Sequence, residues 1–230
     1  MNVVVLLGAP GAGKGTQAPL LATRLGIPAI ATGDLFRAAV RDGTALGQEA
    51  RRYMDAGQLV PDEITVRLLL DRLERPDATA GVILDGFPRT GVQAEALDRA
   101  LAERAARVGA VVLVDVPADE LVRRLSGRWI CRAAGHPYHE TFSPPRVAGV
   151  CDIDGAELYQ RVDDRPDTIR ARMDQQLGAL AEVIDHYRTA GLLRTVDGLQ
   201  GIDLVAEAID AALAEAGIRP AGVPGEHVTG

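Results

Sequence analysis

VVVLLGAPGAGKGTQ, residues 3–17, is the stretch that decides the fold. Its first half, Val3 to Leu7, is entirely aliphatic and predicts a strand that is buried on both faces of a sheet. Its second half is rich in glycine, which lets backbone N–H groups approach an anion, and it leads into a helix whose N-terminus carries partial positive charge. The stretch therefore predicts a phosphate-binding loop between a strand and a helix.

The only lysine of the chain, Lys14, lies in this loop, whereas the rest of the 25 basic residues are arginine. A compact ammonium group on a flexible stem can reach between phosphates where a planar guanidinium does not fit. Many phosphate loops carry Ser or Thr directly after the lysine as a magnesium ligand, but here Gly15 follows and Thr16 comes one place later. This departure disfavours a GTPase or motor site and favours a kinase of small nucleotides.

The composition is that of a globular protein. Its 230 residues are 47% hydrophobic and 25% charged, which suits one domain with insertions. No apolar run is as long as a membrane span, and Met1 leads directly into the first strand, so we expect a cytoplasmic protein without a membrane partner. A net charge of −7 and an aromatic content of 3% disfavour nucleic-acid binding.

Predicted strands and helices alternate along the chain. After the first strand, strands are expected at 27–31, 81–85, 110–116 and 192–196, and helices at 16–25, 32–54, from 61, at 91–107, 117–125, 163–187 and 202–216. This order predicts an α/β fold with a doubly wound, five-stranded parallel sheet and ligands at the carboxyl ends of its strands. Residues 127–159 lack helical periodicity and predict a small β-rich insertion, and the turn-rich residues 217–230 predict a mobile tail.

Several charged residues lie at the ends of predicted elements. Asp85 ends a strand predicted to lie beside the loop strand, where a carboxylate binds magnesium through water. Because an acidic protein that transfers phosphoryl groups needs many fixed cations in one cleft, six arginines at segment edges are candidates for this role. They are Arg37, Arg89, Arg124, Arg128, Arg161 and Arg172.

Seven motifs follow one another along the chain: GAPGAGKGTQ (8–17), TGDLFR (32–37), DAGQLVPDE (55–63), LDGFPRT (84–90) followed by Gln93, Gly127-Arg128, PYHETFSPP (137–145) and YQRVDDRPDTIRAR (159–172). In these motifs and their spacing the sequence resembles the adenylate kinases with a long lid insertion, up to about residue 215. The resemblance implies reversible transfer of a phosphoryl group from ATP, with Mg²⁺, to AMP to give two ADP. It also implies a monomer.

The resemblance assigns regions and residues. It implies a core of residues 1–31, 61–126 and 160–216, an AMP-binding insertion of 32–60 and a lid of 127–159, with both insertions closing over the substrates to exclude water. The implied ATP site is Gly11, Ala12, Gly13, Lys14, Gly15, Thr16, Arg124, Arg128, Pro137, Tyr138 and Gln200. The implied AMP site is Thr32, Arg37, Gln58, Leu59, Val60, Gly86, Phe87, Pro88, Arg89, Gln93, Arg161 and Arg172.

The implied catalytic groups are all cations: Lys14, Arg89, Arg124, Arg128, Arg161 and Arg172. Asp34 and Asp85 are expected to bind magnesium through water, and the Phe87–Pro88 bond is expected to be cis. AMP already carries an anionic phosphate oxygen near neutral pH, so no general base is needed and the cations need only align the reactants and neutralise charge.

In zinc-bearing relatives the lid holds four ligands, first a Cys-x2-Cys pair and then a Cys-x2-Cys or Cys-x2-Asp pair. The corresponding positions here are Cys131, Ala134, Cys151 and Asp154, so one ligand is missing, and we expect His136 to replace it only if the turn is remodelled. The lid is therefore expected to be held by packing, without structural zinc, and the two thiols to lie close together and to be open to oxidation.

The sequence leaves two other functions open. A kinase of another nucleoside monophosphate, such as UMP or CMP, or one that uses GTP, shares these motifs, although Gln93 and Thr32 favour adenine as the acceptor base. The second alternative is a regulatory or nucleic-acid ATPase with a phosphate loop. Such a protein is expected to hydrolyse ATP without AMP, to have a basic face and to carry a hydroxyl residue at position 15. The sequence has Gly15 and a negative net charge.

Overall fold

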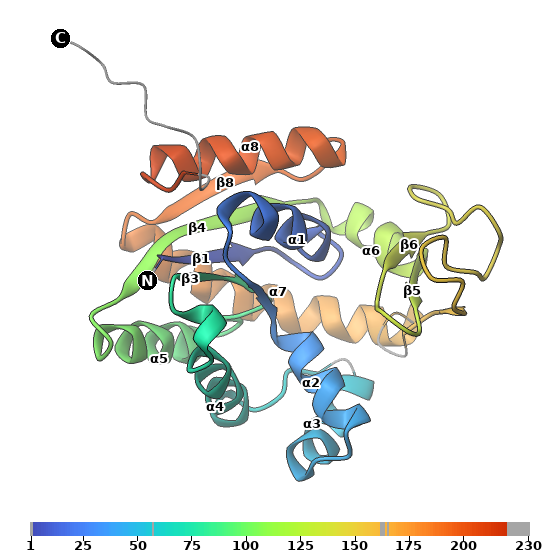
Figure 1. The fold of residues 1–230 in the computed structure, drawn as a ribbon, viewed down its shortest axis with the longest axis horizontal. Helices are drawn as coiled ribbons and strands as arrows, with labels where there is room; N and C mark the ends of the chain where they lie inside the picture. Colours follow the sequence, from blue (N-terminus) through green and yellow to red (C-terminus); the bar gives the residue numbers. More distant parts are fainter. Residues whose placement is uncertain (1, 57, 162–163, 165, 220–230) are drawn as a thin grey trace.

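The computed structural model describes residues 2–56, 58–161, 164 and 166–219 and contains a five-stranded parallel sheet (Figure 1). The strands are β1 (Asn2–Leu7), β2 (Ala29–Ala31), β3 (Gly81–Asp85), β4 (Arg107–Asp115) and β8 (Leu193–Asp197). Their order across the sheet is β2-β3-β1-β4-β8, and every neighbouring pair is parallel. The predicted fold class is confirmed.

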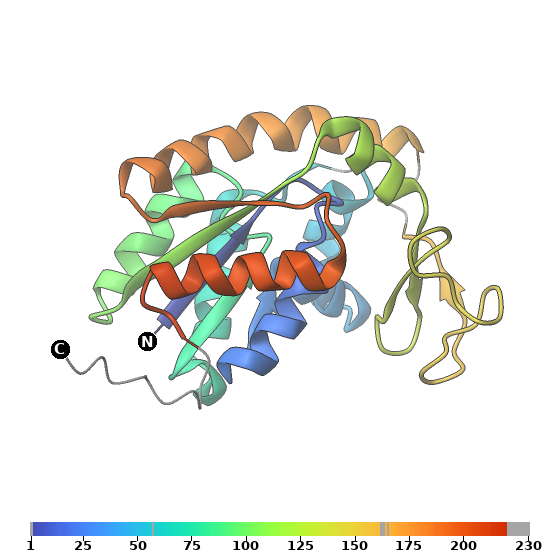
Figure 2. The same cartoon turned by 90° about the horizontal axis from the view of Figure 1, so that it is seen from above.

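Helices cover both faces of this sheet. They are α1 (Lys14–Leu25), α2 (Thr32–Arg41), α3 (Ala45–Asp55), α4 (Asp62–Leu73), α5 (Gly91–Ala102), α6 (Ala118–Ser126), α7 (Pro166–Thr189) and α8 (Ile202–Glu215), with a 3-10 turn at Pro76–Ala78. In Figure 2 the strands β4, in green, and β8, in orange-red, pass between α8, in red, and α7, in orange.

The central strand β1 alternates between two hydrophobic cores. Val4 and Leu6 pack with α1 and α8, whereas Val3, Val5 and Leu7 pack with α4 and α5. Successive side chains of a strand point to opposite faces, so an unbroken aliphatic run is what a strand covered on both sides requires. The phosphate loop that follows β1 is thereby fixed at the carboxyl edge of the sheet.

Two predicted helices are shorter than expected. The helix expected over 32–54 is divided into α2 and α3, because Gly43 has a φ of 67° and Thr44 caps α3 by accepting a hydrogen bond from the Gly47 N–H at 3.0 Å. The helix expected over 91–107 ends at Ala102. Ala105 has a φ of 51° and the Ala106 N–H donates back to the Leu101 carbonyl, which closes the helix before β4 begins.

A second, antiparallel sheet lies beyond α6, apart from the parallel sheet (Figure 1). Its strands are β5 (Arg128–Cys131), β6 (Pro137–His139) and β7 (Leu158–Tyr159), in the order β6-β5-β7. Cys131, Tyr138, Cys151 and Leu158 form its own small core. The expectation of a β-rich insertion is met here, whereas the predicted tail falls mostly on residues 220–230, which lie outside the described residues. Among the described helices, none combines the length and apolarity needed to cross a membrane.

Candidate active site

A cleft of about 980 Å³ opens at the carboxyl edge of the parallel sheet and is bounded by the phosphate loop, the α2–α3 segment and the small sheet. From the expected ATP site it is lined by Gly11, Ala12, Gly13, Lys14, Gly15, Thr16, Arg124, Arg128, Pro137, Tyr138 and Gln200. From the expected AMP site it is lined by Thr32, Arg37, Gln58, Leu59, Val60, Gly86, Pro88, Arg89, Gln93 and Arg161, and Asp34 and Asp85 line it as well.

Among the described residues, Phe87 alone of the expected set is not part of this lining. Phe87 is fully buried, and its side chain packs in the core beside β3. Arg172 belongs to α7, and its side chain lies outside the described part of the chain. The Phe87–Pro88 bond is cis, which confirms the expectation from the motif.

The phosphate loop needs its glycines where it passes other backbone. A Cβ on Gly8 would lie 2.7 Å from the Val114 carbonyl oxygen, and one on Gly11 would lie 3.0 Å from the Leu121 carbonyl oxygen. Both residues also have positive φ values, 148° and 87°, which residues with a side chain rarely adopt. The loop can therefore pass this close to the neighbouring backbone only with glycine at these two positions.

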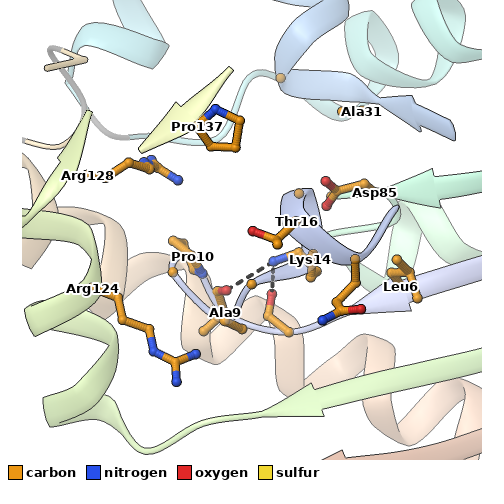
Figure 3. A pocket seen from close by; sticks show the side chains of 18 of the residues that line it. Leu6, Ala9, Pro10, Lys14, Thr16, Ala31, Asp85, Arg124, Arg128 and Pro137 are labelled. Atoms are coloured by element: carbon orange, nitrogen blue, oxygen red, sulfur yellow. Dashed lines mark hydrogen bonds between the residues drawn. The ribbon is translucent and has the colours of Figure 1, made fainter. Parts of the chain in front are cut away.

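Lys14 lies at the centre of the loop (Figure 3). Its Nζ donates to the Gly8 carbonyl oxygen at 2.7 Å and to the Ala9 carbonyl oxygen at 3.0 Å. In Figure 3, Arg124, Arg128, Thr16 and Asp85 surround it. The ammonium group is thus held inside the curve of the loop, where an anion bound by the backbone N–H groups would meet it.

Asp85 ends β3 and pairs in register with Leu6 of β1, so the neighbouring strand carries it to the phosphate loop. Burial raises the pKa of its carboxyl group, and the nearby charges of Lys14 and Arg89 act in the opposite direction. A Cβ on Gly15 would lie 3.6 Å from Asp85 Oδ2. Gly15 stands where many phosphate loops carry a hydroxyl residue, and the Asp85 carboxylate lies close beside it. A carboxylate oxygen in this position fits a hydrated magnesium ion.

The second half of the cleft is built around the LDGFPRT motif. The Thr32 hydroxyl donates to the Gly86 carbonyl oxygen at 2.8 Å. Arg89 Nε donates to the same oxygen at 2.7 Å, and Arg89 Nη1 donates to Gln176 Oε1 at 3.1 Å. Arg37 Nη2 lies 2.5 Å from Asp34 Oδ1. These contacts fix two guanidinium groups at the wall of the cleft.

Gln93 is almost fully buried, with 1% of its surface exposed, yet it forms part of the cleft wall. Its Oε1 accepts from the Arg89 backbone N–H at 2.8 Å, and its Nε2 donates to Asp62 Oδ1 at 2.7 Å. The DAGQLVPDE motif includes Asp62, but nothing in the sequence indicated that its carboxylate would contact the Gln93 amide.

The remaining arginines enter from α6 and the small sheet. Arg124 Nε donates to Glu120 Oε1 at 2.8 Å, and the pKa of Glu120 is lowered, first by Arg124 and then by Arg123. Arg128 Nε donates at 2.7 Å to Oδ2 of Asp164, which is fully buried. Each guanidinium is oriented by a carboxylate, and both line the cleft.

His139 and Phe142 also line the cleft, and neither was among the site residues expected from the sequence. His139 Nδ1 accepts from the backbone N–H groups of Thr141 at 3.0 Å and Phe142 at 3.2 Å, so the neutral ring carries its proton on Nε2. Burial lowers the pKa of this histidine. Successive side chains of a strand point to opposite faces, so His139 lies on the same face of β6 as Pro137, an expected residue of the ATP site. This alternation is the signal by which His139 could have been predicted.

The lid also gathers four metal-ligating side chains, Cys131, His136, Cys151 and Asp154, whose ligand atoms all lie within 4.8 Å of one another. Cys131 Sγ lies 3.2 Å from Asp154 Oδ2, and His136 Nδ1 lies 3.3 Å from Cys151 Sγ. The condition under which His136 was expected to replace the missing ligand is therefore met. The turn that follows Cys131 already brings the His136 ring to the other three groups.

Comparisons with known proteins agree with this geometry. The sequence profile of the family described as adenylate kinase matches residues 6–192. A protein of Streptomyces griseus named adenylate kinase is 50% identical over 210 residues, which cover 90% of this chain and 96% of that protein. A protein of the same name from Staphylococcus aureus is 47% identical over 211 residues, covering 91% of this chain and 98% of its own length.

Proposed function

Because this chain belongs to the adenylate kinase family, it transfers a phosphoryl group between ATP and AMP to form two ADP, and we propose that the transfer takes place in the cleft described above. The observation that carries this proposal is the convergence on one cavity of the phosphate loop, Asp85 and arginines from α2, the LDGFPRT motif, α6, β5 and position 161. Two polyanions can meet only where such cations offset their repulsion.

The phosphate loop and the lid are assigned to ATP. Lys14 and the backbone N–H groups of 11–16 hold its phosphates, while Arg124, Arg128, Pro137, Tyr138 and Gln200 flank the donor nucleotide. Thr32, Arg37, the 58–60 backbone, residues 86–89 and Gln93 hold AMP, with the Gln93 amide at the adenine edge. Arg161 and Arg172 belong to the acceptor side of the transferring group. Among the described residues of this assignment, all but Phe87 line the cleft.

The chemistry needs alignment and charge neutralisation. The acceptor phosphate already carries an anionic oxygen, so no side chain has to remove a proton, and the fixed cations stabilise the charge that spreads over the transferring group. Each well-placed donor of this kind contributes on the order of 3 kcal/mol. A magnesium ion bound with ATP supplies further positive charge, and Asp85 and Asp34 would hold it through water.

Residues 32–60 and 127–159 are proposed to close over AMP and ATP before transfer, because water competes with AMP as the acceptor. Both segments contribute residues to the cleft wall. Residues 1–31, 61–126 and 160–216 are proposed to form the core that carries the phosphate loop.

The four lid groups fit a structural zinc ion. Two thiolates, an imidazole and a carboxylate satisfy the tetrahedral shell that zinc prefers, and all four ligand atoms already lie near one another. The ion would tie the two turns of the lid together and would take no part in the transfer itself.

The decisive experiment for the acceptor is a coupled assay that compares AMP, UMP, CMP and GMP with MgATP. We expect AMP to be phosphorylated most efficiently, since the cleft presents an amide at the base site. Preference for a pyrimidine nucleotide would instead make the chain a kinase of another nucleoside monophosphate. A monomeric state and a cytoplasmic location are further proposals, which light scattering and cell fractionation would test.

A further inference from the structure

The side-chain amide of Gln93 has a hydrogen-bond donor beside its oxygen and a hydrogen-bond acceptor beside its nitrogen. The Arg89 backbone N–H donates to Oε1 at 2.8 Å, and Nε2 donates to Asp62 Oδ1 at 2.7 Å. A backbone N–H can only donate a hydrogen bond, and an ionised carboxylate can only accept one. The positions of the amide oxygen and nitrogen are therefore set by their neighbours.

Asp62 is itself anchored in this position. It lies half-buried in the first turn of α4, and its Oδ2 accepts from the Thr90 hydroxyl at 3.0 Å. The Thr90 oxygen in turn accepts from the Gln93 backbone N–H at 3.1 Å. Gln93 lines the cleft, whereas Asp62 is not among the described lining residues. The carboxylate therefore acts on the amide from behind the cleft wall.

The fixed amide offers a base one particular pattern. An amide carries two N–H donors and two lone pairs, so one of each remains after the bonds to Arg89 and Asp62. The remaining lone pair of Oε1 and the remaining N–H of Nε2 match a base edge that places an amino group beside a ring nitrogen acceptor, as adenine does. A 6-oxopurine presents an oxygen acceptor and an N–H donor in the reverse order, and it requires the amide to turn over.

Turning the amide over is unfavourable. Nε2 would then face the Arg89 N–H, and Oε1 would face the Asp62 carboxylate, so that two hydrogen bonds become two repulsive contacts in a buried place. We propose that Asp62 is a positioning residue that sets acceptor-base specificity by holding the Gln93 amide in the orientation that selects a 6-aminopurine over a 6-oxopurine nucleotide. This inference rests on the proposed role of Gln93 at the acceptor base.

The test compares AMP with IMP, which differs from AMP only in its 6-oxo group and N1–H. Asp62→Asn keeps an oxygen that can accept from Thr90, and its new N–H groups can donate to a turned Gln93 oxygen. The Arg89 N–H still opposes the turn, so discrimination falls but is not lost. We expect the ratio of kcat/KM for AMP to that for IMP to fall about tenfold. Asp71→Asn, at an exposed position of the same helix, is the matched control and leaves this ratio unchanged.

A purely structural role for Asp62 would lower kcat/KM for both nucleotides equally, or lower the melting temperature, at an unchanged ratio. That result overturns the inference. Asp62→Ala provides a second variant, and in it the ratio falls as well because the amide loses its acceptor. If the unaltered enzyme does not phosphorylate AMP, the proposed function itself fails. If it prefers AMP to IMP and both variants keep that preference in full, only the role of Asp62 fails.

Discussion

Replacing Lys14 by methionine removes the only ammonium of the phosphate loop while keeping a long, flexible side chain. A unit charge about 4 Å from a phosphate oxygen contributes about 4 kcal/mol at the effective dielectric constant of a protein surface. Since 1.36 kcal/mol corresponds to a tenfold change in rate, losing this charge should lower kcat by about a thousandfold.

The fold should survive this change. Lys14 Nζ also bonds the Gly8 and Ala9 carbonyl oxygens, and losing two such bonds costs about 1 kcal/mol each before water in the cleft replaces them. We therefore expect a small decrease in melting temperature, measured by circular dichroism, alongside the large loss of turnover in a coupled ADP assay. Lys14→Arg serves as the control that keeps the charge but replaces the compact ammonium with a planar fork.

Because the chain contains a single lysine, chemistry offers an independent test. The chain offers an amine-acylating reagent only one side-chain amine, that of Lys14, and peptide mapping distinguishes its acylation from that of the N-terminal amine or of other nucleophilic groups. Activity should be lost in proportion to acylation of Lys14, and bound MgATP should slow both this acylation and the loss of activity. A Lys14→Met enzyme that retains turnover within tenfold of the unaltered enzyme would refute the assigned role.

Three further predictions concern other parts of the molecule. Arg89→Ala should raise the KM for AMP and lower kcat by on the order of a hundredfold or more with the fold intact, whereas near-normal kinetics would remove it from the acceptor site. Gly47→Ala should lower the free energy of unfolding by about 1–3 kcal/mol, because its Cβ would lie 2.2 Å from the Ala39 backbone; an unchanged denaturant midpoint would contradict this packing of α2 against α3. Protein purified without chelator should contain about one zinc per chain by elemental analysis. Cys131→Ser should reduce that content sharply, and a metal-free wild-type protein would contradict the lid site.

The alternation of aliphatic strands and helices was sufficient to predict the succession of strands and helices along the chain, because the central strands β1 and β3 are buried on both faces and therefore have a simple sequence pattern. Breaks inside helical patterns were harder to locate. The end of α5 depends on a positive φ at Ala105, a residue that gives no turn signal, and the division between α2 and α3 depends on Gly43 and Thr44.

Most of the cleft could be predicted from motifs that each lie in one continuous segment. The sequence could not reveal contacts between segments. Asp62 and Gln93 lie 31 positions apart, and their contact arises only when α4 and α5 pack together. The position of His136 depends likewise on how the turn after β5 folds, which spacing alone did not disclose.

The central claim is that this cleft joins two nucleotides and keeps water from the transferring group. The most direct measurement follows ATP, AMP and ADP by chromatography after mixing the enzyme with MgATP, with and without AMP. We expect two ADP for each AMP consumed, and no measurable loss of ATP when AMP is omitted. Steady hydrolysis of ATP in the absence of AMP, with no stimulation when AMP is added, would contradict the account.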